Sequence, residues 1–430
     1  MEIRLLMKYD PRKSNLLGGN KMSKLKIVNN TKNVFLNSVC AHIRVSRPIV
    51  PPTLNYALRV EKIANSPFVT LWFRTRGCRH DYMGGCSMCN YGKSTPVAAD
   101  DMIEYVKAGL SLAPNEDGMM LLVSPSGSML DDWEVPAQAR EGILELVRKT
   151  NAKTYVCETR IETVTDEKIK QYVEILDNKF MCIEVGLESS NPWVSKYCVN
   201  KELSLQQYIE SMGILRRYKV LSIANVIIGS PFLSPKESIE DAVESIRWAL
   251  SHGTDRCTLF PVHVKRWTLV EWLWEHGQYS PTSLWSLVEV LNRLGPELAQ
   301  KVTISWYKLY IEKMAKGRLN SSTDLGYLSS PTTCPICHSK VISLLDTYRD
   351  TNDFSVIVEL TNLGCACKDA WRSALEKEDL LSLPERVASA YASIGRDVLG
   401  KKWWDENGAN VLVDVNSSAT AFIHSSLEKK

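Results

Sequence analysis

The chain has 430 residues, which is enough for two or three domains and a sizeable buried core. Hydrophobic residues (44%) and charged residues (23%) are close to the averages of ordinary soluble proteins, and a net charge of +3 does not by itself indicate a nucleic-acid-binding protein. No apolar run reaches the roughly eighteen residues of a membrane span, and the N-terminus shows no secretory leader. We therefore predict a cytoplasmic protein with no membrane segment.

Residues 1 to 33 are rich in Lys and Arg and have little apolar periodicity, so we expect a flexible basic segment. Two other interpretations are a nucleic-acid-binding arm and an unused start codon upstream of Met22. We predict a barrel domain over residues 34 to 310 and a C-terminal module over residues 311 to 430.

Short β-branched runs alternate with longer amphipathic stretches from residue 68 onward. The predicted strands are Phe68 to Phe73, Met119 to Val123, Thr154 to Cys157, Met181 to Gly186, Ser222 to Ile228 and Arg256 to Pro261. The predicted helices are Asp100 to Ala113, Pro136 to Thr150, Asp166 to Leu176, Leu205 to Tyr218 and Pro235 to His252. This order indicates an α/β fold with a partial (βα)6-type parallel barrel, whose functional residues follow the strands.

The stretch GCRHDYMGGCSMCNYG at 77 to 92 follows the first predicted strand and contains Cys78, Cys86 and Cys89. Three thiolates bind three irons of a [4Fe–4S] cluster and leave the fourth iron open, and the glycines let the loop approach the cluster closely. A structural zinc site needs four ligands, and His80 is the candidate for the fourth. A loop without metal is the remaining alternative.

On these residues the chain resembles the radical S-adenosylmethionine superfamily. That resemblance implies that the open iron binds S-adenosylmethionine and that one electron cleaves it to a 5′-deoxyadenosyl radical. Seven residues separate Cys78 from Cys86, whereas three separate the corresponding cysteines in most of the superfamily. This departure limits the resemblance to a smaller family within the superfamily.

Within the superfamily, the chain is similar to the radical enzyme family of archaeosine synthesis over residues 68 to 372. The similarity is carried, in order, by RTRGC with GGCSMCNYG, by SGSMLDDWEVP at 126 to 136, by CETRIE at 157 to 162, by GLESSNPWV at 186 to 194, by VNKELS at 199 to 204, by IGSPFLSPKESIED at 228 to 241, and by TLVEWLWEHGQYSPTSLWSLVEVL at 268 to 291.

This resemblance implies a radical lyase that breaks the carbon–nitrogen bond of a lysine-adducted 7-deazaguanine in the tRNA D-loop and so forms archaeosine. It also implies a complex with the lysine-adding archaeosine synthase subunit and an electron donor such as ferredoxin or flavodoxin. A radical enzyme of the same subgroup that acts on a small metabolite or peptide is the alternative. A non-catalytic zinc-binding adaptor is a rival from another class.

Polar residues that follow the second and third predicted strands are candidates for binding the cofactor. Ser126, Gly127 and Ser128 offer backbone and hydroxyl groups for its methionyl end, although a plain turn has the same composition. Glu158 and Arg160, two residues apart, are expected on one face, where they would hold an amine and a carboxylate; an internal ion pair is the alternative.

Three further charged residues lie in the later motifs. Glu188 is a candidate for a ribose or amino group of the cofactor, unless it caps a helix or forms a salt bridge. We assign Lys201 and Arg266 to the reaction itself, as candidates for the substrate carboxylate or the tRNA phosphates, with ordinary surface charge as the alternative.

Two cysteine pairs near the C-terminus predict a second metal site: Cys334 with Cys337, and Cys365 with Cys367. Four thiols in two close pairs can bind one tetrahedral zinc ion, with a strand predicted from Phe354 to Leu360 between the pairs. A second iron–sulfur cluster and unligated cysteines are the alternatives. The five scattered cysteines are expected to be buried apolar residues: Cys40, Cys157, Cys182, Cys198 and Cys257.

Overall fold

The computed structural model describes residues 32–47, 55–63, 66–91, 95–309, 312–314, 319–320, 326–377 and 379–427. The predicted basic segment 1 to 33 lies outside these residues, except for its last two. Residues 31 to 430 form one compact unit, to which the following description applies.

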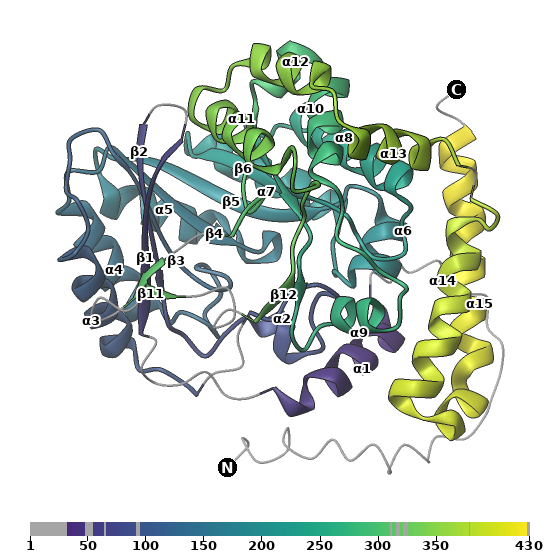
Figure 1. Ribbon diagram of the computed structural model, residues 1–430. Helices are drawn as coiled ribbons and strands as arrows, with labels where there is room; N and C mark the ends of the chain where they lie inside the picture. The colour runs from purple at the N-terminus through teal and green to yellow at the C-terminus, as the bar shows by residue number, and fades with distance from the viewer. Residues whose placement is uncertain are drawn as a thin grey trace, which may run out of the picture. The chain divides into compact units, whose positions relative to one another are not determined.

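A curled, mostly parallel sheet is the centre of this unit (Figure 1). Its strand order is β11-β10-β1-β2-β3-β4-β5-β6-β7-β9, and the strands from β2 to β9 run parallel. The parallel strands are β2 (Ser66–Phe73), β3 (Met120–Pro125), β4 (Thr154–Thr159), β5 (Phe180–Glu188), β6 (Leu221–Ile228), β7 (Arg256–Pro261) and β9 (Val302–Ile304). The α/β half-barrel predicted from the sequence is therefore confirmed, with all six predicted strands in it.

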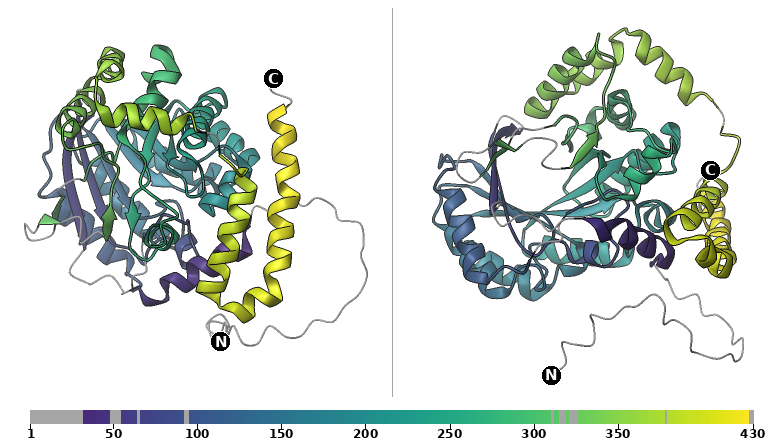
Figure 2. Two further views of the ribbon diagram at one scale, coloured as in Figure 1. Left: turned by 45° about the vertical axis from the view of Figure 1, so that its right-hand side comes forward. Right: turned by 60° about the horizontal axis from the view of Figure 1, so that its bottom comes forward.

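Helices cover the outer face of the curl, as the views in Figure 2 show. They are α3 (Ala99–Leu110), α4 (Ala137–Arg148), α5 (Asp166–Leu176), α7 (Leu205–Arg217), α8 (Pro235–Ser251) and α10 (Leu284–Ala299). The first five match the predicted helices to within three residues at each end. Their apolar sides and the strands enclose the largest hydrophobic core of the described residues.

Side-chain caps at the N-termini explain why these helices begin where they do. Thr165 accepts a hydrogen bond from the backbone N–H of Lys168 at the start of α5. Ser234 and Glu237 form a reciprocal capping box at the start of α8, with Pro235 in the first turn. The caps fix the boundaries that the 3.6-residue periodicity alone leaves uncertain by a few residues.

The antiparallel end of the sheet was not predicted. Strand β1 (Tyr56–Ile63) pairs antiparallel with β2, and the short strands β10 (Glu312–Met314) and β11 (Leu319–Asn320) extend the sheet beyond β1. A separate ribbon joins β8 (Val264–Lys265) to β12 (Tyr327–Ser329). Residues after 310 therefore pair with strands of the barrel, and a domain boundary at residue 310 stays a prediction.

The segment between the two C-terminal cysteine pairs is helical, so the strand predicted from Phe354 to Leu360 is wrong. Helix α12 (Phe354–Asn362) begins at the capping side chain of Asp353 and buries Val356, Ile357 and Leu360. The spacing of these three residues is that of one helix face, and it outweighs their β-branched composition. Helices α11 (His338–Thr351) and α13 (Ala366–Leu375) flank it.

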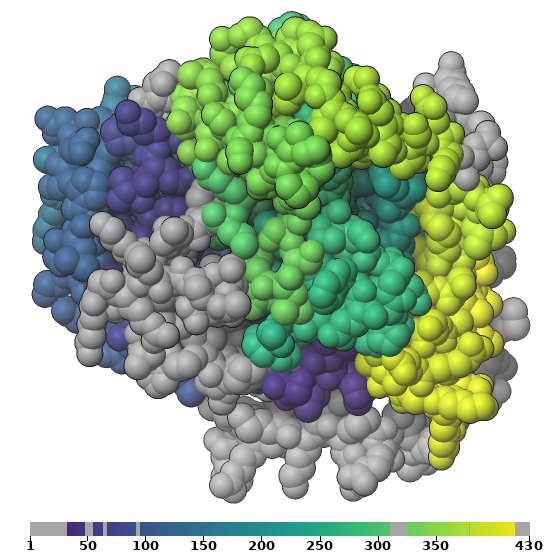
Figure 3. Space-filling model, viewed as in Figure 1, coloured from purple at the N-terminus to yellow at the C-terminus, as the bar shows by residue number. Residues whose placement is uncertain are grey.

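A helical hairpin at the C-terminus packs on a helix near the other end of the chain. Helices α14 (Leu383–Ile394) and α15 (Lys401–Leu427) contact the single turn Gly395–Leu399 and α1 (Val34–Ile43). The ring of Phe35 lies 4.6 Å from that of Tyr391 and 5.9 Å from that of Trp404. Figure 3 shows α14 and α15 in yellow beside the light-green helices α11 to α13. No helix of the described residues is long and apolar enough to cross a membrane.

Two glycines make room for Trp404 in this hairpin. A Cβ atom at Gly395 would lie 2.2 Å from the indole, and one at Gly408 would lie 2.5 Å from it. We expect Gly395→Ala to lower the free energy of unfolding by about 1 to 3 kcal/mol, because the buried ring must move. Urea unfolding is the measurement. Gly213→Ala in α7 is the control, since open space surrounds it, and should stabilise by up to about 1 kcal/mol. A Gly395→Ala protein as stable as the wild type would contradict this packing.

Candidate active site

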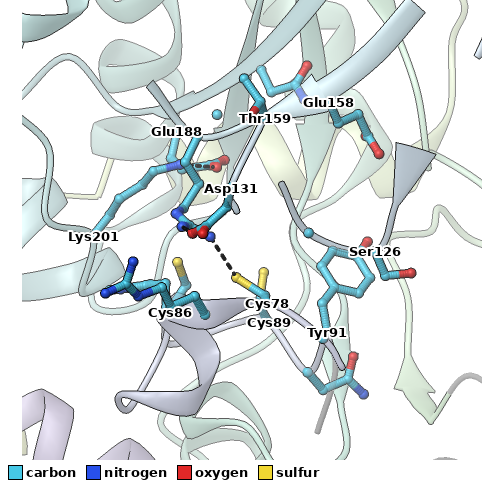
Figure 4. Close-up of a pocket in the computed structure, with 18 of the residues that line it drawn as sticks. Cys78, Cys86, Cys89, Tyr91, Ser126, Asp131, Glu158, Thr159, Glu188 and Lys201 are labelled. Atoms are coloured by element: carbon cyan, nitrogen blue, oxygen red, sulfur yellow. Dashed lines mark hydrogen bonds and ion pairs between the residues drawn. The ribbon is translucent and has the colours of Figure 1, made fainter. Parts of the chain in front are cut away.

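The three thiols of the first cysteine group face a cavity of about 1070 Å³ inside the half-barrel. Cys78, Cys86 and Cys89 all line it, and Figure 4 shows their sulfur atoms pointing in the same direction, toward Asp131 and Lys201. The loop that carries them follows β2, so the predicted position at the carboxyl end of a strand is confirmed. Burial raises the pKa of the Cys78 thiol to about 12.

Arg44, which follows α1, holds the loop from behind. Its guanidinium donates to the backbone carbonyls of Gly84, Cys86 and Cys89, the last two at 2.7 and 2.6 Å. It also lies 2.8 Å from a carboxylate oxygen of Asp81, which Arg47 approaches to 2.5 Å. All three charged side chains are at least 95% buried, so the loop is held by a nearly dry ion-pair group.

The glycines in this loop are required by close backbone approach. Gly84 has a φ of 120°, and a Cβ atom there would lie 2.7 Å from the carbonyl oxygen of Asn37. The side-chain amide of Asn200 donates to Asn37 at 2.9 Å and to the carbonyl of Gly85 at 2.7 Å. Only a residue without a side chain fits between these partners.

The geometry of the loop does not favour a mononuclear zinc site with His80. Nε2 of His80 lies 2.9 Å from the carbonyl oxygen of Asn200, so it must donate a proton there. Zinc with 2.3 Å sulfur bonds keeps its ligand atoms about 3.8 Å apart. Among the described residues, the group whose spacing suits a single metal ion is that of the C-terminal cysteines, whose sulfur atoms all lie within 4.8 Å of one another.

Arg160 lies beside the first of these thiols. It comes directly after β4, and its Nη1 donates to Sγ of Cys78 at 3.6 Å. It also forms ion pairs with Asp131, Glu134 and Glu162, the last at 2.6 Å. Arg160 therefore takes part in internal ion pairs, which was the alternative to cofactor binding considered from the sequence. Its side chain also lines the cavity.

Glu188 and Lys201, for which separate roles were predicted, form one ion pair at 2.9 Å on the cavity wall. Glu188 ends β5 with a φ of 63°, next to an irregularity in the pairing with β6. A Cβ atom at Gly186 would lie 2.4 Å from Nζ of Lys201, so this glycine leaves the space for the pair.

Two of the predicted residues do not line the cavity. Ser128 is fully buried, and its hydroxyl lies 2.6 Å from that of Thr159, whereas Ser126 and Gly127 do reach the cavity. Arg266 is exposed and lies outside the cavity, while its neighbour Lys265 lines it. The roles proposed for these residues stay predictions.

Glu158, predicted from the sequence, lines the cavity within its strand, but sequence reasoning missed its polar neighbours Glu184 and Asn225. Glu184 on β5 lies directly opposite Glu158 on β4, and Asn225 on β6 lines the same region. Burial raises the pKa of Glu158 to about 7, and burial together with Glu158 raises the pKa of Glu184 to about 8. A charged or amide residue within an otherwise apolar strand was the available signal.

The four C-terminal cysteines form a second compact group. Cys334 lies 3.6 Å from Cys337 and 3.5 Å from Cys365, and Cys367 lies 3.5 Å from both Cys337 and Cys365, measured between sulfur atoms. The indole of Trp285 donates to Cys367 at 3.3 Å. These distances are close to those of four sulfur ligands around one tetrahedral ion. The other five cysteines are buried, as predicted.

We expect Arg44→Met to loosen the thiol loop, because three buried carbonyls would lose their donor. The free energy of unfolding should fall by about 3 kcal/mol or more. Alkylation of the loop cysteines in the folded protein should become faster. Arg47→Met is the matched control, since Arg47 shares Asp81 but donates to none of these carbonyls. Equal effects of the two substitutions on alkylation would refute a specific role for Arg44.

Comparison of the sequence with those of known proteins shows the family to which this chain belongs. No family model matches the chain. A protein of Methanosarcina acetivorans named archaeosine synthase subunit beta is 30% identical over 318 residues, which cover 72% of this chain and 86% of that protein. A protein of the same name from Thermococcus kodakarensis is 28% identical over 332 residues, covering 75% and 97%.

Solved structures that match include the archaeal Elp3 of Methanocaldococcus infernus, at 14% identity with a TM-score of 0.41 over 63% of this chain and 60% of that one. Methylornithine synthase matches at 11% identity with a TM-score of 0.42 over 79% and 89%. The sequence relationship to the Methanosarcina acetivorans protein covers most of both chains. This chain therefore belongs to the archaeosine synthase subunit beta family.

Proposed function

We propose that this protein is a radical S-adenosylmethionine lyase of tRNA modification, which cleaves the carbon–nitrogen bond of a lysine-adducted 7-deazaguanine to form archaeosine. The observation that carries the proposal is the group of three thiols that open together into a large cavity with several charged side chains on its wall, in a chain of this family. The cavity volume of about 1070 Å³ is at the upper end of small-molecule sites, as expected if it holds a cofactor and a modified base together.

The residues present fit a [4Fe–4S] cluster. Three cysteines line the cavity, and glycines let the loop surround a bulky group. Cys78, Cys86 and Cys89 would hold three irons, and the cavity lies on their open side. When bound, the cluster and S-adenosylmethionine supply a radical that removes a hydrogen atom from an unactivated carbon.

The chain's own groups balance charge around the thiols and orient what enters. Arg160 donates to Sγ of Cys78, and so offsets negative charge that metal binding leaves on the sulfur. Its ion pairs with Asp131 and Glu134 fix the guanidinium in place. The pair of Glu188 and Lys201 presents a carboxylate and an ammonium to polar groups of the cofactor, which is the role we propose for it.

The substrate base must leave the tRNA fold to reach this cavity. Extrusion of a base costs a few kcal/mol of unstacking, which contacts at the mouth must offset. The exposed Arg266 beside the cavity-lining Lys265 is a candidate for a phosphate contact there. Because tRNA is the substrate, we place the reaction in the cytoplasm.

Two protein partners follow from the proposed reaction. The relatives are named as a beta subunit, which supports a complex with another archaeosine synthase subunit, here the one that adds lysine. Reduction of the cluster requires an electron donor such as ferredoxin or flavodoxin.

The test is an anaerobic assay for 5′-deoxyadenosine with tRNA that carries the lysine adduct, deuterated on the lysine carbon bonded to the amidine nitrogen. We expect tRNA-dependent 5′-deoxyadenosine that contains deuterium, because the hydrogen atom is removed from that carbon. Loss of one further electron from the resulting carbon radical to the electron-transfer protein, followed by addition of water, would then break the bond to nitrogen, release the lysine chain as an aldehyde and leave the formamidine. Cys86→Ala should abolish the product by removing one thiol that lines the cavity. Mass spectrometry of the nucleoside is the measurement.

The other outcomes of this assay would each contradict a different part of the proposal. Cofactor cleavage that ignores tRNA would favour a small metabolite or peptide as substrate. 5′-Deoxyadenosine without deuterium would rule out the proposed carbon. A reconstituted protein that stays colourless and binds no iron would favour a non-catalytic zinc-binding adaptor.

For the C-terminal cysteine group we propose a structural zinc ion. The four thiols surround one point at tetrahedral distances and lie at the N-termini of α11 and α13, so an ion there would join the two helices. Burial raises the pKa of Cys367, but hydrogen bonds from Trp285 and the other cysteines lower it to about 6, which favours a thiolate. The buried ammonium of Lys368 donates to three carbonyls that end α12.

We expect about one zinc per chain by elemental analysis, and none in Cys365→Ser, because that thiol contacts two of the other three. The variant should also unfold at a lower temperature, since binding of the ion is coupled to folding. Cys257→Ser, at a buried cysteine remote from this group, should keep its zinc. About four extra irons per chain in place of zinc would indicate a second iron–sulfur cluster.

A further inference from the structure

A buried ammonium without a carboxylate partner lies on the cavity wall. Lys265 is 8% exposed, and among the described residues no carboxylate forms an ion pair with it. Its Nζ lies 4.5 Å from the ring centre of Tyr91, 4.9 Å from that of Tyr327, and 3.5 Å from the hydroxyl of Tyr91. Two aromatic faces offset only part of the cost of burying a charge. The ammonium is thus prepared for an anionic group that enters the cavity.

The opposite charge is concentrated elsewhere in the same cavity. Glu158 and Glu184 are Cα partners on neighbouring parallel strands, and both line the cavity. Neither carboxylate forms an ion pair within the part of the chain that the structure describes. The carboxylate of Glu158 accepts a hydrogen bond from the indole of Trp72 at 3.4 Å, and the carboxylate of Glu184 accepts one from the side chain of Asn225. Two facing carboxylates repel each other in a dry site unless a cation or a proton comes between them.

Two further observations around this pair indicate a ligand. Oδ1 of Asn225, which also lines the cavity, is buried and has no hydrogen-bond partner in the structure. An orphaned acceptor beside two carboxylates calls for a group with several N–H donors. The guanidinium of Arg59 lies near enough to lower the pKa of both carboxylates, but its ion pair at 2.5 Å is with Glu61, and it lies over the ring of Trp72 at 4.8 Å.

We propose that Glu158 and Glu184 bind the ammonium, and Lys265 the carboxylate, of a free α-amino acid group on the substrate. This inference rests on the proposed function, in which that group is the far end of the lysine adduct. A single cationic group would leave Lys265 unpaired, and a single anionic group would leave the two carboxylates unpaired. A zwitterionic head satisfies both.

The depth of the residues agrees with this orientation. Glu184 precedes Glu188 by four residues on β5, which places it about 13 Å further from the carboxyl end of the strand. Figure 4 shows Glu188 and Lys201 on one side of the three thiols and Tyr91 with Glu158 on the other. A base at the mouth with its lysine chain directed inward would bring the carbon bonded to nitrogen past the thiols and the ammonium of its amino acid end to the two carboxylates.

The cofactor also contains an α-amino acid group, so the two sources must be distinguished. That group of S-adenosylmethionine belongs next to the cysteines, where Arg160 and the Glu188–Lys201 pair lie. Substitutions at Glu184 or Lys265 should therefore leave the affinity for S-adenosylmethionine within about threefold of wild type, as measured by equilibrium dialysis with the reconstituted protein.

The test compares three tRNAs whose 7-deazaguanine carries, through an amidine, L-lysine, cadaverine or 6-aminohexanoate. Cadaverine lacks the carboxylate, and 6-aminohexanoate lacks the α-amine. We expect wild type to prefer the lysine adduct over either analogue by roughly 100-fold or more in affinity, because each analogue leaves buried charges unpaired. Equilibrium binding with S-adenosylmethionine present needs no turnover, so the result stands even if the proposed reaction fails.

The variants should lose these preferences separately. Lys265→Met should reduce the preference for the lysine adduct over the cadaverine adduct to below about tenfold, and should keep the preference for lysine over 6-aminohexanoate. Glu184→Gln should reduce the preference for lysine over 6-aminohexanoate to below about tenfold, and should keep the preference for lysine over cadaverine. Lys265→Arg should retain part of the preference, since it retains the charge. Arg266→Met, at the exposed neighbour, should change neither ratio. Urea unfolding and iron content confirm that each variant is folded.

Two results would overturn the inference. One is a wild-type protein that binds all three adducts equally, and the other is a Lys265→Met protein that keeps its preference for lysine over cadaverine. Failure of the proposed function gives a different pattern, in which 5′-deoxyadenosine forms without any of the three tRNAs while the binding preferences hold.

Discussion

The buried guanidinium of Arg44 is the interaction on which the geometry of the thiol loop depends. The loop has little regular structure of its own, since only Arg79–Tyr82 is helical within it. Its carbonyls need donors from elsewhere in the chain, and Arg44 supplies them to Gly84, Cys86 and Cys89. Asp81, on the same loop, neutralises the charge that this brings into the interior. A bulky cofactor needs ligands whose positions are set before it binds, and this group of contacts sets them.

The same constraint explains why α1 packs on the C-terminal hairpin. Arg44 can reach the loop only if α1 is fixed, and α1 packs through Phe35 on Tyr391 and Trp404 of the C-terminal hairpin. The side chain of Asn33 adds a hydrogen bond of 3.0 Å to the hydroxyl of Tyr391. The C-terminal helices, which carry no chemistry of their own, thus support the active site from a distance.

The barrel could be predicted from the sequence because its strands and helices are specified locally, by period-two and period-3.6 apolar patterns and by caps such as Ser234 and Thr165. The strands β10 and β11 could not, because they have two or three residues and depend on pairing with β1 some 250 residues earlier. Helix α12 shows a related difficulty, because two sequence signals disagree there. Its β-branched residues favour a strand, whereas the spacing of its apolar residues favours a helix.

The residues of the candidate site also divide into some that could be predicted from the sequence and some that could not. Residues at the rim could be named from the rule that function follows strand ends, and Arg160, Glu188 and Lys201 do lie there. Glu158, deeper in the cavity, was also named because it lies near a strand end, but Glu184 was not. A strand pattern shows that Glu184 faces opposite to its neighbours in the strand, but not which face of the sheet encloses a cavity. The contrast of Arg266 with Lys265 has the same origin, because one step along an extended chain turns a side chain to the other face. Arg160 and Lys201, the rim cations named from the sequence, each have a carboxylate partner in the structure. Glu158 and Glu184 form no ion pair among the described residues, and under our proposal the ammonium of a ligand offsets their charge while Lys265 binds its carboxylate, so that the distribution of charge in the cavity selects what enters.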